Sequence, residues 1–149
     1  MNEDLCKRIQ DAFAGVTLGN GVGLQQAQGL DDYDDEATCN RYRDTDEKDD
    51  WSQISVEALN RCNSSLSFFD AEGMRFHLPA YLITDLQGAY HFDLIFCLTH
   101  LNDYRISQFA LLSEAQRSAV RVFLLHIAKQ PDSDFDRPHI TLALNEYWT

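Results

Sequence analysis

His91 and Asp93 are the two residues of this sequence best suited to acid–base chemistry. They lie in a segment with alternating apolar residues, and in a strand two residues separated by one point to the same side. An imidazole beside a carboxylate can exchange protons with a substrate or orient a metal ligand. A match of two residues also arises by chance, so we favour the ordinary polar face of a half-buried strand. The same interpretation holds for His77 beside Pro79.

Acidic residues spaced by two suggest a calcium loop. Asp32, Asp34 and Glu36 match the first three ligand positions of an EF-hand. Ala37 then stands where glycine makes the sharp turn, and Arg43 stands where the bidentate Glu belongs. A solvated acidic surface is the better interpretation, and we assign no metal ligand here.

Gly19, Gly21 and Gly23 resemble a phosphate-binding loop only superficially. Their spacing is not G-x-G-x-x-G, they follow a predicted helix rather than a strand, and five carboxylates come soon after them. We therefore predict a hinge or a helix cap. G-x-S-x-G is absent from the sequence as well, so the motifs predict no catalytic residue and no cofactor.

The four cysteines are scattered, without the close spacing of disulfide frameworks or zinc sites. Cys6, Cys62 and Cys97 fall on apolar faces, so we expect reduced core residues. Cys39 lies in a polar region and is expected to be exposed.

Negative charge is concentrated in residues 31–50, which carry ten acidic and three basic residues and contribute −7 of the net charge of −12. Like charges repel, so this segment must be offset elsewhere or stay solvated and mobile. Such a balance argues against binding of nucleic acid or anionic lipid and permits a basic protein partner. The candidate partner-binding residues are Asp31, Asp32, Asp34, Asp35, Glu36, Asp46 and Glu47.

A basic ridge is the one local concentration of positive charge in the second half of the sequence, formed by Arg117, Arg121 and Lys129. The acidic segment could fold back on this ridge, in which case each exposed ion pair would contribute under about 1 kcal/mol. Alternatively, the acidic residues face outward. The sequence leaves both arrangements open.

Periodicity and capping residues predict several helices. Apolar spacing predicts an N-terminal helix over 5–16, and a shorter one is expected over 24–29. Ser55 is expected to cap a helix, and Ser113 with Gln116 forms a capping box at the start of another. Pro79 is expected to open a short helix over 80–86, and Asp136 to cap a last helix from about 138.

Two segments predict strands. Alternation in 66–78 around the turn Asp70–Gly73 predicts a hairpin, and 91–99 is the clearest strand, with Phe92, Leu94, Phe96 and Leu98 on one face. The expected fold is therefore α+β and mainly α, with amphipathic helices packed on a small two- to three-stranded sheet.

The length of 149 residues predicts a single domain, with the acidic segment 31–50 as a mobile part of it. The acidic start is not followed by an apolar run, so no secretory signal is expected. No apolar stretch approaches the roughly 18–20 residues of a membrane span, and a cytoplasmic location is expected.

The block Leu66–Tyr81, LSFFDAEGMRFHLPAY, resembles the central motif of an uncharacterised family of small bacterial proteins, a domain of unknown function. The resemblance extends to Trp51 and to the later helix with Leu112–Gln116, Ala119-Val120 and Phe123-Leu124. It implies a bacterial, intracellular, single-domain protein, and it implies no catalytic residue.

Three functions are compatible with these features. We rank first a non-catalytic interaction protein whose acidic surface engages a basic partner, in the manner of immunity proteins that plug toxins. Second is a protein whose acidic run serves only solubility. Third is a small-molecule or metal-dependent enzyme using His91, Asp93 or His77 with nearby acids, for which a concave pocket holding those side chains would be required.

Overall fold

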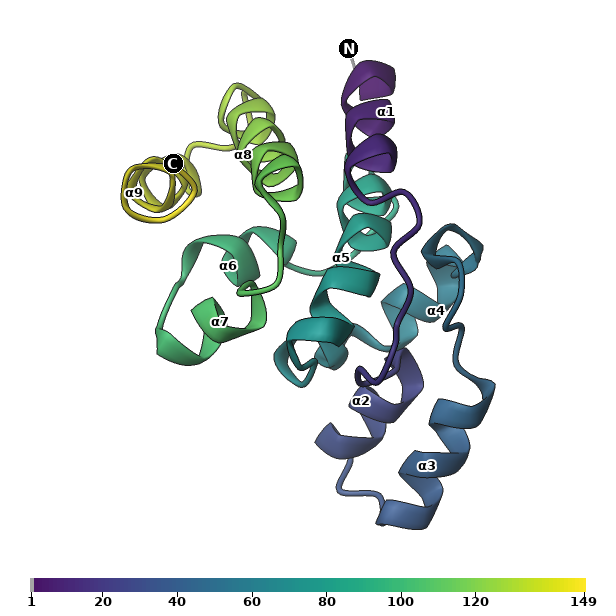
Figure 1. The fold of residues 1–149 in the computed structure, drawn as a ribbon. Coiled ribbons are helices and arrows are strands. Elements are labelled where there is room, and N and C mark those ends of the chain that lie inside the picture. The colour runs from purple at the N-terminus through teal and green to yellow at the C-terminus, as the bar shows by residue number, and fades with distance from the viewer. Residues whose placement is uncertain (1) are drawn as a thin grey trace.

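The computed structural model describes residues 2–149, and these are helical with no β-strand among them (Figure 1). The α-helices are α1 (Asn2–Ala12), α2 (Leu24–Asp31), α3 (Glu36–Thr45), α4 (Val56–Arg61), α5 (Ala71–Leu86), α6 (Leu94–Thr99), α7 (Asp103–Gln108), α8 (Glu114–Ala128) and α9 (Arg137–Glu146). Two short 3-10 helices, η1 (Trp51–Gln53) and η2 (Asn63–Ser67), flank α4.

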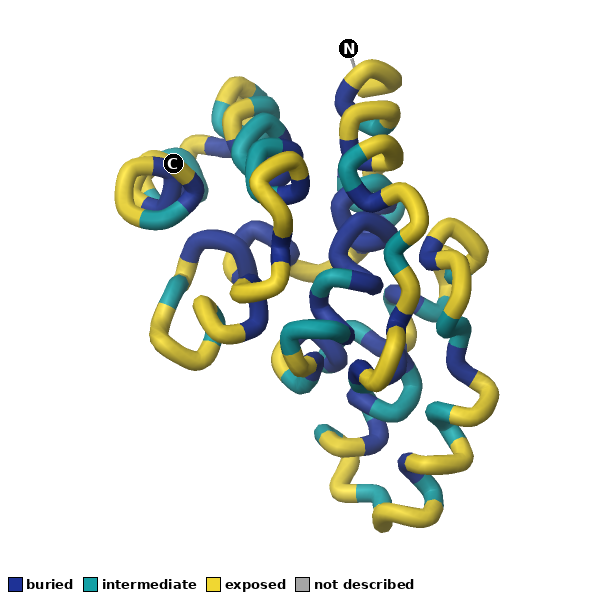
Figure 2. Tube along the Cα trace, in the orientation of Figure 1, coloured by how far each residue is buried: buried dark blue, intermediate teal, exposed yellow. Residues whose placement is uncertain are grey.

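Helix α5 is the centre of the molecule. Eleven of its sixteen residues are buried, and Figure 2 shows the buried part of the trace concentrated along it. Contacts reach it from α1, α6, α7 and η1. A helix that is apolar on nearly every side must be enclosed by others, which explains its place in the fold.

Several of the other helices pack against one another. Helix α1 lies against α8, where the amide of Gln116 donates to the carbonyl of Ala12 at 3.1 Å. Helix α9 packs on both α6 and α8 (Figure 1). Helices α2 and α3 form an antiparallel hairpin that extends from the other end of the molecule and contacts η2.

The predicted hairpin over 66–78 is wrong, because this region is η2 followed by the first half of α5. Asp70 is the helix cap: its Oδ1 accepts from the backbone N–H of Gly73 at 2.8 Å. An Asp that precedes a Gly serves a turn and a helix start equally well, so the local signal was ambiguous. Pro79 does not open a helix either, but lies inside α5.

The strand predicted over 91–99 is also wrong, and the expected sheet is therefore absent from residues 2–149. Asp93 caps α6 through its Oδ1, which accepts from the N–H of Phe96 at 3.0 Å. Leu94, Ile95, Cys97 and Leu98 are all buried. With apolar residues on two sides of a helix of six residues, an alternating pattern could not be told from a helical one.

The helices predicted from capping signals are confirmed. Ser113 accepts from the N–H of Gln116, whose side chain accepts in turn from the N–H of Ser113, at 3.1 and 2.9 Å. Ser55 caps α4 through Ala58, and the N-terminal helix is present as α1. The last helix begins near the expected position, although the Asp136 side chain makes no capping hydrogen bond.

Within residues 2–149, no helix combines the length and hydrophobicity that a bilayer-spanning segment needs.

Candidate functional site

The α2–α3 hairpin carries most of the acidic segment. Asp35 caps α3 by accepting from the N–H of Thr38 at 2.8 Å. The thiol of Cys39 is buried against Gly29 of α2, contrary to the exposure expected from the sequence. Burial raises the pKa of that thiol, and all four cysteines of the chain are free. The two helices are therefore joined through a packed interior.

The turn between the two helices presents an aromatic ring to solvent. Tyr33 is 94% exposed and is the one non-glycine residue with positive φ (59°) in residues 2–149. Leu30 beside it is 42% exposed. A bulky residue in the left-handed region is uncommon and carries local strain, which marks this turn as unusual.

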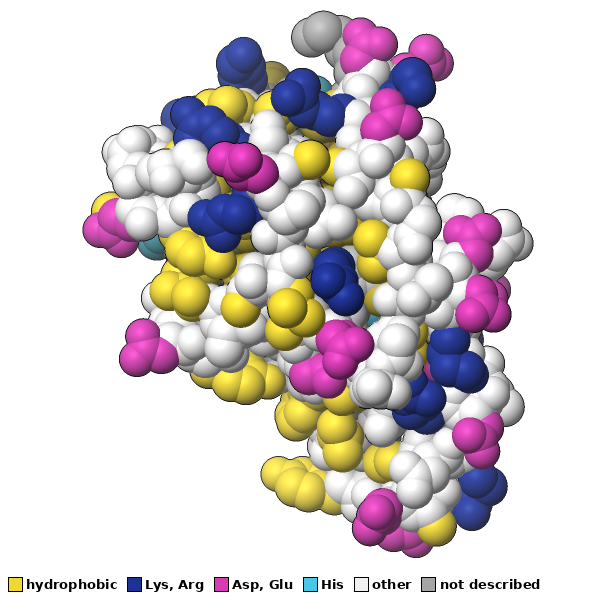
Figure 3. Space-filling view, viewed as in Figure 1, with side chains coloured by type: hydrophobic (Ala, Val, Ile, Leu, Met, Phe, Trp, Pro, Cys, Tyr) yellow, Lys and Arg dark blue, Asp and Glu magenta, His cyan; other side chains and the backbone are white. Residues whose placement is uncertain are grey.

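The predicted partner-binding residues fall into two groups. At the turn end of the hairpin, Asp32, Asp35 and Glu36 are exposed and Asp31 and Asp34 are half-buried. Figure 3 shows acidic side chains over this end of the molecule, with basic side chains beside them on the same face.

Asp46 and Glu47 lie at the opposite end of the hairpin. Asp46 is buried, and its two carboxylate oxygens accept from the N–H groups of Gln25 and Gln26 at 2.9 and 3.1 Å. These are the first N–H groups of α2, so Asp46 caps that helix from a distant position in the sequence. Glu47 is half-buried and accepts from the N–H groups that follow it.

The basic residues of the segment form no ion pair with its carboxylates. Arg43 donates to the carbonyls of Gly19 and Gly21, and Lys48 Nζ donates to three carbonyls at the end of α3. Arg41 donates to the Thr38 hydroxyl. The ion pairs of residues 2–149 are elsewhere, in α1 and at the start of α9.

The basic ridge binds the C-terminal residues instead of the acidic segment. The guanidinium of Arg117 lies over the ring of Tyr147 at 4.3 Å and donates to its carbonyl. Arg121 donates to the carbonyl of Trp148 at 2.8 Å. Of the two arrangements that the sequence left open, the fold-back on this ridge does not occur.

The glycine-rich loop before α2 is held by the start of α5. Asp70 accepts from the N–H of Val22 at 3.0 Å, and Glu72 accepts from the N–H of Asn20 at 3.3 Å. A Cβ placed on Gly21 would lie 2.7 Å from the backbone nitrogen of Gly73. The loop is therefore in direct backbone contact with α5, as a tether for α2 and not as a phosphate cradle.

This contact predicts that Gly21→Ala lowers the free energy of unfolding by about 2–3 kcal/mol, because the clash is with backbone that cannot rotate away. Chemical denaturation followed by circular dichroism measures it. Gly88→Ala is the control, since its φ is 71° but nothing lies within 4 Å of the added Cβ. Gly88→Ala should lower the free energy of unfolding by only about 1–2 kcal/mol, because alanine is strained in the left-handed backbone conformation. A smaller loss at Gly21 than at Gly88 would contradict the close approach.

A cavity of about 100 Å³ opens between the α2–α3 hairpin and α5. Its lining comes from four parts of the chain: the start of α2, the end of α3, the start of α4 and the middle of α5. The lining residues are Leu24, Gln25, Thr45, Asp46, Glu47, Ile54, Ser55, Ala58 and His77.

His77 lines this cavity, and one of its two ring nitrogens has no hydrogen-bond partner. The side chain is fully buried and stacks on Phe69, with ring centroids 4.3 Å apart. Nδ1 lies 2.7 Å from the carbonyl of Gly73, whereas Nε2 has no hydrogen-bond partner. Burial lowers the pKa of His77 to about 4, so the ring is neutral at pH 7. Nδ1–H then donates to Gly73, and Nε2 is a free acceptor.

Asp46 supplies a second polar group. Burial is the main cause that raises the pKa of its carboxyl, and the N–H groups of Gln25 and Gln26 oppose that rise. The structure thus places His77, Asp46 and Glu47 in the lining of one cavity, and the enzyme hypothesis had combined His77 with acidic residues. No three His, Cys, Asp or Glu side chains among residues 2–149 are grouped so that they could hold a metal ion.

His91 and Asp93 do not form the pair that a strand would have given. Both are exposed, and Asp93 is engaged as the cap of α6. The backbone N–H of His91 donates to Asn60.

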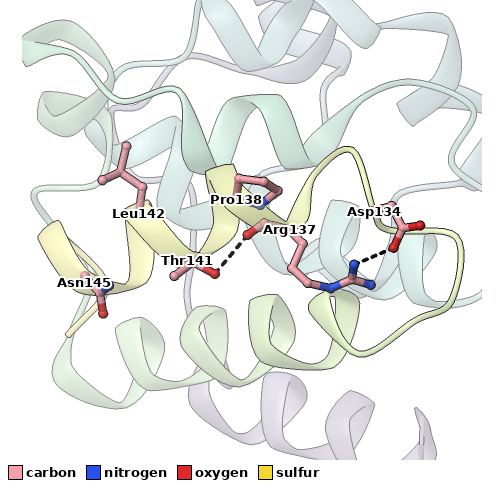
Figure 4. Close-up of a pocket in the computed structure, with 6 residues that line it drawn as sticks. All are labelled: Asp134, Arg137, Pro138, Thr141, Leu142 and Asn145. Atoms are coloured by element: carbon pink, nitrogen blue, oxygen red, sulfur yellow. Dashed lines mark hydrogen bonds and ion pairs between the residues drawn. The ribbon is translucent and has the colours of Figure 1, made fainter.

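A larger open hollow of about 490 Å³ lies along α9 (Figure 4). Three of its polar residues are paired with one another: Arg137 with Asp134 at 2.5 Å, and the Thr141 hydroxyl with the Arg137 carbonyl at 3.0 Å. Leu142 and Asn145 point outward from the helix in the same view. Neither of the buried polar atoms that lack a partner in residues 2–149 lies in its lining, so nothing marks it as a binding site.

Sequence reasoning missed both the enclosed position of His77 and the role of Asp46 as a cap. A cap normally precedes its helix directly, so an Asp following the next helix carries no local signal. Tyr33 could have been noticed as an aromatic residue in the middle of an acidic run.

The comparison with known families decides the affiliation. The sequence profile of a family of unknown function, DUF6714, matches residues 1–149. The chain belongs to this family. No curated protein and no solved structure matches the chain.

Proposed function

We propose that this chain is a non-catalytic interaction protein that docks on a basic protein partner through the turn of its α2–α3 hairpin. The observation that carries the proposal is an almost fully exposed Tyr33 within a run of acidic residues whose carboxylates form no ion pair with a basic side chain. The docking turn consists of residues 30–36.

The carboxylates and the exposed tyrosine of the docking turn would contribute differently to binding. Uncompensated carboxylates accelerate encounter with a basic surface by long-range steering. An exposed tyrosine flanked by polar residues is typical of the anchor that supplies most of the binding free energy. We propose that the chain acts in the manner of an immunity protein, by plugging a basic toxin-like partner with this surface. Asp46 and Glu47 lie at the other end of the hairpin and are not part of this surface.

Neutralising the docking turn without unfolding it tests the proposal. Asp31, Asp32 and Asp34 are changed together to Asn, while Asp35 is kept because it caps α3. Affinity capture from the native lysate, at low and at high salt, should show basic proteins that bind the wild type and are lost with the triple variant. High salt should weaken the wild-type interaction as well.

A matched control removes the same number of charges elsewhere. The exposed residues Asp11, Asp132 and Glu146 are changed to Asn, Asn and Gln. This control should retain the captured proteins, and Tyr33→Ala should reduce them by about tenfold or more at unchanged net charge. Identical captured proteins for the wild type and all variants would refute the proposal.

A further inference from the structure

The partly buried Arg and Lys side chains of residues 2–149 bind their own chain, with one exception. Those that donate to backbone carbonyls are Arg43, Lys48, Arg105, Arg117, Arg121 and Arg137. The exception is Arg75 of α5, which is also partly buried. Its guanidinium makes no hydrogen bond and no ion pair within the described part of the chain.

The nitrogens of this guanidinium differ in their access to solvent. Nε is buried and has no hydrogen-bond partner, whereas the terminal nitrogens Nη1 and Nη2 also lack partners but are not buried. Native proteins rarely leave a buried donor unpaired without a reason. A guanidinium carries five N–H donors in a planar fork and no acceptor. The terminal nitrogens of Arg75 are therefore available to an acceptor that the chain itself does not supply.

Arg75 lines an open hollow of about 330 Å³ where the loop after α1 meets α5 and the start of α8. The other lining residues are Ala14, Gly15, Val16, Thr17, Leu111, Ser113 and Gln116. A Cβ added to Gly15 would have nothing within 4 Å, so there is open space beside the loop. The Ser113 hydroxyl accepts from the N–H of Gln116 and keeps its own proton for a second acceptor.

The charge of the lining favours an anion. Arg75 is the one charged residue in it, and neither Asp nor Glu is among the lining residues. The net charge of −12 repels anions at long range, and repels a dianion more strongly than a monoanion. A carboxylate carries a single charge, and its two oxygens match the guanidinium fork in a bidentate contact. A carboxylate therefore fits this hollow better than a dianion does.

We propose that Arg75 binds a carboxylate group in this hollow, with the two carboxylate oxygens accepting from Nη1 and Nη2. Ala14, Val16 and Leu111 offer apolar surface to a short alkyl stem. The carboxylate can belong to a small free acid or to the C-terminus of a peptide. None of the lining residues lies in the α2–α3 hairpin, so this site is separate from the docking turn.

Two resonances in ¹H–¹⁵N spectra of the full-length protein report on the hollow: Arg75 Nε and the backbone amide of Gly15. At pH 7, titration with sodium propionate should move both along one saturating curve. Sodium chloride at equal ionic strength and propionamide, the uncharged match, should leave both unmoved. Sodium sulfate, a dianion, should bind less tightly than propionate. No response to propionate, an equal response to propionamide, or tighter binding of sulfate would overturn the proposal.

Two further titrants separate the sources of the carboxylate. Nα-acetyl-alanyl-alanine ends in a free α-carboxylate, and its C-terminal amide is the uncharged match. A saturating response to propionate and to the peptide acid supports a peptide C-terminus as ligand. A response to propionate alone supports a small free acid. Equal responses to the peptide acid and its amide would count against carboxylate recognition.

Substitutions assign the binding to the guanidinium, with the Gly15 amide as the probe in each variant. Arg75→Gln removes the cation and should weaken propionate binding by about tenfold or more, since a hydrogen bond to a charged group is lost. Arg75→Lys keeps the charge but loses the planar fork, and should weaken binding by about threefold to fivefold.

Lys129→Gln is the matched control, because it changes the net charge equally at an exposed position outside the hollow. It should leave propionate binding unchanged. Binding in Arg75→Gln as tight as in the wild type would overturn the proposal. Equal binding in the wild type and Arg75→Lys would overturn the bidentate contact even if Arg75→Gln does not fold.

Discussion

Trp148→Ala is expected to lower the free energy of unfolding by about 3–5 kcal/mol, because it removes a large side chain from a close-packed position. Trp148 is 1% exposed and packs edge to face on Phe109, with ring centroids 5.0 Å apart. Its indole Nε1 donates to the carbonyl of Leu98 in α6 at 2.9 Å. Arg117 of α8 lies 5.3 Å from its ring. One side chain thus joins α6, α8 and the end of α9.

Urea denaturation followed by fluorescence and circular dichroism measures this loss. Phe135→Ala is the control: this ring is also aromatic and precedes α9, but it is 80% exposed. It should change stability by no more than about 0.5 kcal/mol. Equal effects of the two substitutions would mean that the C-terminal residues are not packed as described.

Buried His77 is expected to make stability depend on acid pH. Its pKa is lowered from 6.5 to about 4 in the folded protein, so between these values the unfolded chain binds more protons than the folded one. The contribution of His77 to the free energy of unfolding therefore increases as pH rises from about 4 to 6.5. It decreases again as pH falls through the same range. A shift of this size corresponds to about 3 kcal/mol.

Asp85 opposes this effect. Burial, with a smaller contribution from Asp93, raises the pKa of Asp85 from 3.8 to about 6, so the folded protein binds more protons between those values. Its contribution to stability falls as pH rises through the same range. Because Asp85 is partly exposed, we expect solvent screening to reduce this contribution to about 1–2 kcal/mol.

Two variants separate the titrations. Asp85→Asn should be more stable than the wild type by about 1–2 kcal/mol at pH 7, and its stability should rise more steeply between pH 4 and 6.5. In His77→Phe, the free energy of unfolding should no longer increase between pH 4 and 6.5. Asp46, whose pKa is also raised, titrates in both variants and cancels in the comparison. Parallel curves of stability against pH for wild type and His77→Phe would show that His77 is not buried in its neutral form.

The sequence by itself determined those helices whose signals are local. Ser55 and the pair Ser113 and Gln116 mark helix starts by bonds that span a single turn of backbone, and the apolar stripe of α8 repeats at helical spacing. These features need no knowledge of what the helix packs against. The concentration of acidic residues was equally plain, but whether they were neutralised was not.

Tertiary structure alone decided the nature of α5 and α6. Each is apolar on more than one side because it is enclosed by other helices, and such a segment loses the periodicity that separates helix from strand. Asp70 and Asp93 began helices where a turn and a strand had been predicted.

The cavity at His77 depends on the packing of distant segments even more than α5 and α6 do. Its walls come from four segments that no local rule connects, and Asp46 reaches the start of α2 only because α3 folds back beside it. Capping and periodicity act over one or two turns of backbone, whereas the approach of distant segments follows from how the whole set of helices buries its apolar surface. For that reason the helices with local signals could be read from the sequence, and the cavity lined by His77 could be found only in the folded protein.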